Sequence, residues 1–294
     1  DGLPYIRRDG AVNPESRGPT SDWQALKTMT DAVPALSLAY YFSGEEHYAK
    51  KASELLRVWF LDPQTRMNPH LRFGQAIPGR TQGRGIGIIE TRQFLEIIEA
   101  AGILADSDHW TADDQRRLQG WFREYLEWLL NSPHGRDEDR TRNNHGTWYD
   151  AQVVAFAWFS GQQKVARERL QQVAARRIDT QIAEDGRQPE ELARTRSFTY
   201  SAMNARGFLT LATYGKRLGV DLWGHQGENG QSIPAAIHYL ARYADSEREW
   251  PFKQIKEINR AEALQPLLAQ VVATFKCRQA AEALALDLQV RGLM

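Results

Sequence analysis

Apolar side chains recur every three or four residues along almost the whole chain, which is the spacing of amphipathic helices. Alternating apolar and polar runs, typical of strands, are scarce. Polar capping segments such as Thr20-Ser21-Asp22 and Thr111-Ala112-Asp113-Asp114 indicate helix starts. The pattern therefore predicts an all-α fold. Helices are expected over residues 23–42, 45–60, 86–104, 111–130, 147–159, 162–182, 191–214, 232–243 and 260–275.

Four breaks between predicted helices, each carrying a glycine, recur at similar intervals. Gly44, Gly102, Gly161 and Gly215 are 58, 59 and 54 residues apart. A repeated unit of two helices and a long loop predicts stacked helical hairpins, as in an α/α toroid or solenoid. Functional residues are then expected in the long loops. These loops are residues 61–85, 132–146, 184–190 and 221–231.

The charge balance and the cysteine content exclude several classes of protein. Among 294 residues, 37 Lys and Arg face 37 Asp and Glu, which argues against a nucleic-acid binder and an acidic disordered tail. No apolar run is long enough for a transmembrane helix, so we expect no membrane insertion. The single cysteine, Cys277, excludes an internal disulfide and a Cys-based zinc site. The chain begins with Asp1, so we expect a processed secreted protein or a chain whose start was removed.

Arginine greatly outnumbers lysine among the basic residues. There are 29 Arg against 8 Lys, together with 9 Trp and 10 Tyr. Guanidinium groups bind planar carboxylates, and aromatic faces stack on sugar rings. Genome composition explains the arginine excess equally well.

The most unusual stretch is Asn143-Asn144-His145-Gly146-Thr147-Trp148-Tyr149-Asp150, where a polar loop becomes an apolar helix. Main-chain N–H groups at a helix start favour an anion, and Asn and His side chains add donors to it. The alternative is that Asn143 or Asn144 only caps the helix and that His145 only lines a wall, without binding an anion.

A second stretch, residues 190–200, combines two arginines with a tyrosine. Arg196 and Tyr200 are four residues apart and share a face of the predicted helix. Arg194 lies six residues before Tyr200, so the two are on different faces unless the helix starts after Arg194. A nearby Arg favours the ionised phenol electrostatically. The alternative is a solvated Arg face and a core Tyr.

A third stretch is a glycine-rich loop that opens a helix. It contains His70, Gln75, Arg80 and Arg84, but neither a nucleotide-loop consensus nor a preceding strand. Its glycines allow close approach of a chain-like ligand, and Arg80 and Arg84 either meet acidic groups or are solvated. The seven His are scattered without metal-ligand spacing, and the serine-nucleophile motif G-x-S-x-G is absent. We therefore expect no metal and no other cofactor.

Together, these stretches resemble the alginate lyase superfamily. The Gly-Thr-Trp-Tyr-Asp continuation looks most like polysaccharide lyase family 38, whereas family 5 carries a related Asn-Asn-His motif with another continuation. The resemblance spans nearly the whole chain, and its octapeptide around His145 is specific. It rests on residues 3–10, 75–79, 83–89, 143–150, 189–194, Tyr200 and 250–254.

The resemblance implies one α/α-toroid lyase domain over residues 1–294, lacking an N-terminal Trp- and Pro-rich segment. It implies β-elimination on a polyuronate such as alginate or glucuronan, in the periplasm or outside the cell, at a metal-independent site. The expected partner is an acidic polysaccharide. The implied catalytic residues are Asn144, His145, Arg194 and Tyr200, although the family 5 spacing leaves Arg194 and Arg196 both open. The implied substrate-binding residues are His70, Gln75, Arg80, Arg84, Asn143, Trp148, Tyr149, Glu191 and Arg196.

Elimination removes the weakly acidic C5 proton beside the uronate carboxylate. Asn144, His145 and an Arg would neutralise that carboxylate, and Tyr200 would act as base. One Tyr acting as both base and acid fits syn elimination, and a division between His and Tyr fits anti; the sequence leaves both open. Two other functions are also open: a non-catalytic binder of acidic polysaccharide, and an inverting glycoside hydrolase. The hydrolase would use carboxylates from among Glu90, Asp150, Glu190 and Glu191.

Overall fold

The computed structural model describes residues 9–11, 21–77, 79–244, 248–277 and 280–282. Within these ranges the regular structure is helical, with two isolated bridges and no β-strand. The predicted all-α class is therefore confirmed. The expectations placed on Thr20, on Pro78 and on the opening segment before Asp9 fall outside the described residues. None of the helices searched is both long and apolar enough to cross a membrane.

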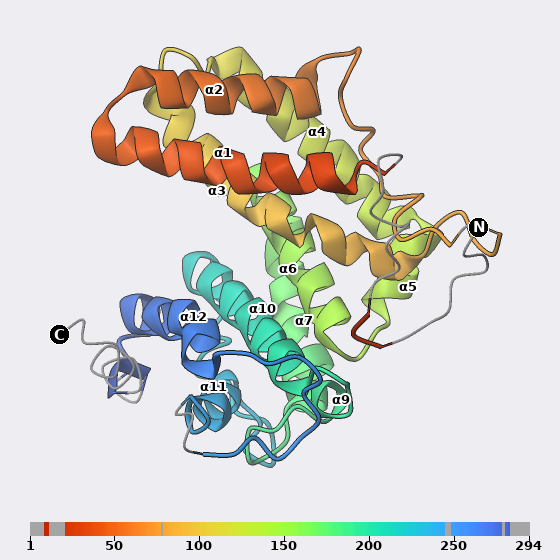
Figure 1. Ribbon diagram of the computed structural model, residues 1–294, viewed down its shortest axis with the longest axis vertical. Helices are drawn as coiled ribbons and strands as arrows, with labels where there is room; N and C mark the ends of the chain where they lie inside the picture. Colours follow the sequence, from red (N-terminus) through yellow and green to blue (C-terminus); the bar gives the residue numbers. More distant parts are fainter. Residues whose placement is uncertain (1–8, 12–20, 78, 245–247, 278–279, 283–294) are drawn as a thin grey trace. The chain divides into compact units, whose positions relative to one another are not determined.

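The chain divides into two compact units, whose elements are labelled in Figure 1. Among the described residues, unit 1 covers 21–77, 79–138 and 155–166, and unit 2 covers 9–11, 139–154, 167–244, 248–277 and 280–282. The expectation of one domain over residues 1–294 stays a prediction.

Unit 1 is organised around the antiparallel pair α1 and α2, with α1 also packed on α3. Its core is aromatic: the Phe60 ring centroid lies 4.8 Å from that of Trp121 and 5.3 Å from that of Phe94. Its elements are α1 (Trp23–Ser43), α2 (Glu46–Leu56), the π-helix η2 (Arg57–Leu61), the 3₁₀-helices η3 (Gly85–Gln93) and η4 (Leu104–Asp106), α3 (Phe94–Ile103), α4 (Ala112–Asn131) and α5 (Pro133–Asp139).

Unit 2 is organised around the long helix α10, which packs against α9, α11 and α12. Figure 1 shows α10 beside the blue helices α11 and α12. The first residues of α6 also belong to this unit, as does most of the segment from α7 onward. The elements are α6 (Asn144–Phe159), α7 (Gln163–Val173), the π-helix η5 (Ala174–Ile178), α8 (Asp179–Gln181), α9 (Pro189–Leu192), α10 (Ser197–Leu218), α11 (Ile233–Ala241) and α12 (Arg260–Phe275).

Local helix signals are confirmed where they act within one turn. Thr111 and Asp114 form a reciprocal capping box at the start of α4. Gly44 and Gly161 adopt φ of 72° and 79° just after α1 and α6, a conformation that glycine adopts without strain.

Two of the predicted glycine breaks are wrong, because Gly102 and Gly215 lie inside α3 and α10. A Cβ at Gly215 would lie 2.4 Å from the Val220 carbonyl oxygen, so this glycine permits close packing of the returning chain. The helix itself ends later, at Gly219 with φ of 72°.

The predicted helix over 191–214 is also wrong at its start, because α9 ends at Leu192 and α10 begins at Ser197. Contacts with residues distant in sequence keep the intervening segment from forming a helix. The main-chain N–H of Thr195 donates to Asp9 Oδ2 at 2.9 Å, and that of Ser197 donates to the Lys253 carbonyl at 3.1 Å. These contacts replace the hydrogen bonds of a continuous helix.

The predicted loop 132–146 contains a further helix, α5. In this helix Gly135 packs so closely on the preceding chain that a Cβ would meet the Leu129 carbonyl oxygen at 1.7 Å. Because α5 is short and largely polar, periodicity did not predict it.

Candidate active site

The motif at residues 143–150 forms the start of α6, inside unit 2. Asn144 is the first residue of the helix and is 1% exposed. Its main-chain N–H donates to Glu191 Oε1 at 2.5 Å, and its Nδ2 donates to Glu191 Oε2 at 2.7 Å. One carboxylate therefore both caps α6 and holds the Asn144 amide.

A buried ionic network fixes the rest of this helix start. Asp150 is 1% exposed and accepts from Arg177 Nε at 2.8 Å and from Arg169 Nε at 2.7 Å. Arg177 also donates to the Thr141 carbonyl at 2.6 Å. A Cβ at Gly146 would lie 2.4 Å from Arg177 Nη1, so only glycine fits between the helix and this guanidinium.

Arg194 lies in the open segment between α9 and α10, where an ion pair fixes it. Its Nε donates to Asp9 Oδ1 at 3.0 Å and its Nη2 donates to the same oxygen at 2.5 Å. The other oxygen of Asp9 accepts from Thr195 N and Oγ1, both at 2.9 Å. Sequence reasoning missed Asp9, since no local signal joins residues that are 185 positions apart.

Both arginines of the second stretch lie beside Tyr200. The Arg194 guanidinium carbon is 4.3 Å from the Tyr200 ring centroid, and that of Arg196 is 6.0 Å away. Because α10 starts only at Ser197, Arg194 reaches the ring from outside the helix. The structure thus brings together one phenol ring and two guanidinium groups.

The pKa shifts in this site reflect burial and ion pairing. Burial raises the pKa of Glu191, whereas the Asn144 hydrogen bonds and the charges of Arg194 and His145 oppose that rise. The hydrogen bond from Arg194 holds the pKa of Asp9 well below its usual range. The hydrogen bond to Asp9 raises the pKa of Arg194, which therefore stays charged.

The other predicted residues of the octapeptide differ in exposure. His145 is half-buried, its main-chain N–H donates to Asn143 Oδ1 at 3.1 Å, and its charge acts on Glu191. Trp148 is 7% exposed and donates from Nε1 to the Met203 carbonyl at 3.0 Å, while Tyr149 is 2% exposed. Both aromatic side chains pack in the core, so their predicted contact with substrate stays a prediction.

The remaining predicted substrate-binding residues belong to unit 1. Gln75 has an unusual φ of 47° and donates from Nε2 to Glu90 Oε1 at 2.8 Å. Arg84 donates from Nε to the Gln75 carbonyl at 2.9 Å. Arg80 is exposed at a turn, and the His70 ring lies 6.2 Å from that of Trp128.

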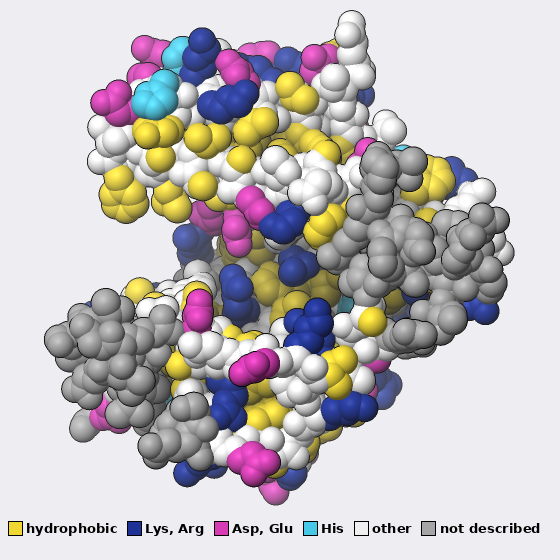
Figure 2. Space-filling model, viewed as in Figure 1, with side chains coloured by type: hydrophobic (Ala, Val, Ile, Leu, Met, Phe, Trp, Pro, Cys, Tyr) yellow, Lys and Arg dark blue, Asp and Glu magenta, His cyan; other side chains and the backbone are white. Residues whose placement is uncertain are grey.

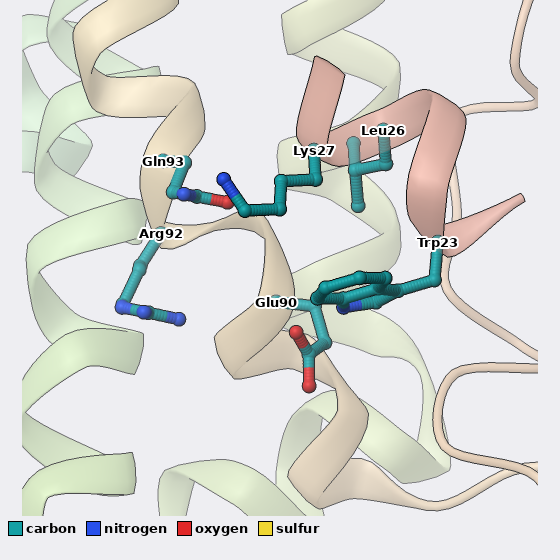
Figure 3. Close-up of a pocket in the computed structure, with 6 residues that line it drawn as sticks. All are labelled: Trp23, Leu26, Lys27, Glu90, Arg92 and Gln93. Atoms are coloured by element: carbon teal, nitrogen blue, oxygen red, sulfur yellow. The ribbon is translucent and has the colours of Figure 1, made fainter. Parts of the chain in front are cut away.

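Glu90 also lines a shallow hollow of about 190 Å³ in unit 1. Figure 3 shows the Trp23 indole beside the Glu90 carboxylate and Lys27 reaching from α1 toward Gln93. Leu26 and Arg92 complete the lining. The Gln75–Arg84 loop is therefore hydrogen-bonded to the wall of a surface hollow.

No group of three or more His, Cys, Asp or Glu side chains within the described ranges is placed to hold a metal ion. The predicted site residues of unit 2 carry amide, imidazole, guanidinium, phenol and carboxylate groups.

Comparisons with known proteins identify the family. The alginate lyase family profile matches residues 1–250. The chain is similar to the crystal structure of an alginate lyase from Bacteroides ovatus, at 40% identity and a TM-score of 0.92 over 98% of this chain and 76% of that one. No curated protein sequence gives a significant match.

A more distant likeness shows the fold alone. Alginate lyase A1-III from Sphingomonas species A1 is 18% identical, with a TM-score of 0.65 over 94% of this chain and 75% of that one. A histidine-to-alanine variant of A1-III, in complex with a tetrasaccharide, is also 18% identical and has a TM-score of 0.66 over the same shares. The predicted α/α-toroid class is confirmed by these likenesses. Since the profile covers most of the chain and the Bacteroides ovatus enzyme matches nearly all of it, the protein belongs to the alginate lyase family of polysaccharide lyases.

Proposed function

We propose that this polysaccharide lyase cleaves a polyuronate of the alginate type at the site formed by α9, the start of α6 and the start of α10. The observation that carries the proposal is the Arg194 guanidinium, 4.3 Å from the centroid of the Tyr200 ring. Asn144 and His145 lie in the same unit. The compared relatives are alginate lyases by name, which favours alginate over glucuronan as substrate.

The difficult step is removal of the C5 proton, because the electron pair left behind spreads onto a carboxylate that is already negative. Donors aimed at the two carboxylate oxygens lower this barrier, and one preorganised donor contributes about 3 kcal/mol. Asn144, His145 and Arg194 are assigned this role. Arg194 is well suited, since its ion pair with Asp9 engages Nε and Nη2 and makes no contact with Nη1.

Tyr200 is assigned the proton transfers. Its phenolate takes the C5 proton, the electron pair forms the C4–C5 double bond, and the C4–O4 bond breaks. The leaving O4 then takes a proton from the Tyr200 hydroxyl or from His145. The Arg194 guanidinium carbon lies 4.3 Å from the centroid of the ring that carries out these transfers.

Substrate contacts outside these four residues are proposed from the sequence motifs. Asn143 and Arg196 would bind sugar groups beside the reacting uronate, and His70, Gln75, Arg80 and Arg84 would bind other parts of the polymer. Glu191 is assigned to Asn144 rather than to the sugar, because both of its oxygens accept from Asn144. Action in the periplasm or outside the cell stays a prediction.

The hydrolase alternative has little support from the described carboxylates. Asp150 is held by Arg169 and Arg177, and Glu191 by Asn144. Glu90 accepts from Gln75. An inverting hydrolase needs one free general acid and one free general base, and three of its four candidates are engaged.

The substrate panel that tests this function is alginate, polymannuronate, polyguluronate and glucuronan, each incubated with the protein. Elimination predicts rising ultraviolet absorbance from the unsaturated uronate, with the strongest rise on an alginate-type polymer. New reducing ends without that absorbance would support hydrolysis instead. No product from any polyuronate would refute the proposal.

A further inference from the structure

Two acidic side chains of unit 2 contact the groups assigned to the uronate carboxylate. Asp9 contacts Arg194, and Glu191 contacts Asn144. Neither acid was assigned such a role from its own sequence context, and an acid facing an anionic substrate directly would repel it. Their contacts with these donors need another explanation.

The Asp9 carboxylate links two neighbouring residues, Arg194 and Thr195. One of its oxygens accepts two hydrogen bonds from Arg194, and the other accepts two from Thr195. Gly10 has φ of 75°, and a Cβ there would lie 2.7 Å from Thr195 Oγ1. The close approach of this N-terminal segment to the Arg194 loop therefore depends on glycine.

The Glu191 contact is equally specific. Glu191 is 1% exposed, and its two oxygens accept from the main chain and from the side chain of Asn144. The amide can therefore rotate only by breaking a buried hydrogen bond to a carboxylate, which is costly.

We propose that Asp9 and Glu191 are positioning residues, each of which holds one donor, Arg194 or Asn144, in the orientation that receives the uronate carboxylate. The inference rests on the proposed function, because it takes from there what the two donors do. Each acid acts through its own donor and makes no contact with substrate.

Double-mutant cycles test this pairing. Asp9→Asn keeps the shape of the side chain but removes its charge and weakens its ion pair with Arg194. Because misplacement of a donor lowers turnover, we expect a loss of up to about 100-fold. In an Arg194→Gln background the same change is expected to alter kcat/KM by no more than about twofold. Glu191→Gln is expected to behave likewise against Asn144→Ala, which keeps the main-chain N–H.

Matched controls separate positioning from folding. Asp9→Asn and Asn144→Ala affect two different acid–donor pairs, so the effects of the two substitutions on kcat/KM are expected to multiply. Asp185→Asn removes an exposed partner of Arg187 in the same unit and is expected to leave kcat/KM unchanged. Thermal unfolding of each variant reports stability, and if Glu191→Gln does not fold, the Asp9 cycle decides alone.

The outcomes keep the two proposals distinguishable. Multiplying effects in the Asp9–Arg194 cycle would overturn the inference while lyase activity of the unmodified protein stood. If the unmodified protein bound a mannuronate tetrasaccharide without cleaving it, the proposed function would fail, and the same cycle measured as dissociation constants would decide the inference. Absence of both cleavage and binding would overturn both.

Discussion

At the scale of single residues, the site is defined by how charges are shared around Tyr200. Both Arg194 and Arg196 lie near its ring, but only Arg194 combines the shorter distance of 4.3 Å with an ion pair to Asp9. The buried Nε of Arg196 has no hydrogen-bond partner among the described residues. The two arginines are therefore expected to differ in what their loss does.

Arg194→Gln is expected to lower kcat by about 100- to 1,000-fold, because it removes a donor aimed at charge that develops during the reaction. Arg196→Gln is expected mainly to raise KM, because it removes a contact made equally before and during the reaction. Steady-state kinetics on an alginate-type polymer measures both. The reverse pattern would assign the carboxylate to Arg196.

A second residue-scale feature is an ion pair in unit 1, between Asp114 and Arg57. Although burial opposes it, hydrogen bonds from Arg57 and Thr111 lower the pKa of Asp114 to about 2. Its unfolded value is near 4. The stabilisation is therefore complete above about pH 4 and is lost as the pH falls through the folded value.

Asp114→Asn is accordingly expected to lower the free energy of unfolding at pH 7 by about 1–2 kcal/mol. The difference from the unmodified protein should shrink between pH 4 and pH 2, where Asp114 itself becomes protonated. Denaturant unfolding at several pH values measures this. A difference that stayed constant down to pH 2 would show that the carboxylate charge does not contribute.

At the scale of elements, periodicity predicted where most helices lie, because each helix buries an apolar face. It failed at residues 193–196, where the apolar spacing continues but contacts from Asp9 and Lys253 hold the chain open. That interruption is what brings Arg194 to Tyr200. The motif at 143–150 was predicted to start a helix, but the Glu191 carboxylate that accepts from Asn144 lies 47 positions away and could not be predicted from the motif.

The start of α6 also explains one residue of the motif. Gly146→Ala would place a Cβ 2.3 Å from the Thr141 carbonyl oxygen and 2.4 Å from Arg177 Nη1. We expect a loss of about 1–3 kcal/mol of stability and reduced turnover, since the displaced helix start carries Asn144.

Gly120→Ala provides the matched control, because a Cβ at that position inside α4 meets nothing within 4 Å. This change is expected to be neutral or to stabilise the protein by up to about 1 kcal/mol. Thermal unfolding compares the two variants. Equal effects at both glycines would contradict the packing explanation.

At the scale of the whole molecule, zero net charge and an anionic substrate are compatible. The 37 basic residues are mostly arginine, and Figure 2 shows Lys and Arg side chains, with Asp and Glu side chains among them, on the surface of unit 2. A local cationic surface binds a polyanion while acids elsewhere balance the total. The absence of nucleic-acid and membrane partners, expected from composition, stays a prediction, and pairings such as Asp9 with Arg194 depend on tertiary folding and leave no local pattern.

The arginines assigned to an anionic substrate predict a dependence on salt. Raising ionic strength screens exposed charges, so KM for a polyuronate should increase between low and physiological salt while kcat changes little. Initial rates at several salt concentrations measure this. A KM that did not respond to salt would indicate that long-range attraction does not contribute to binding.

The most direct test of the central claim is the turnover of Tyr200→Phe. This variant keeps the ring beside Arg194 but removes the hydroxyl, so it should bind an alginate-type oligosaccharide with near-normal affinity and release no unsaturated product. Tyr214→Phe on the same helix, where Arg217 lies 5.7 Å from the ring, provides the control and should stay active. Normal ultraviolet product formation by Tyr200→Phe would contradict the proposed mechanism.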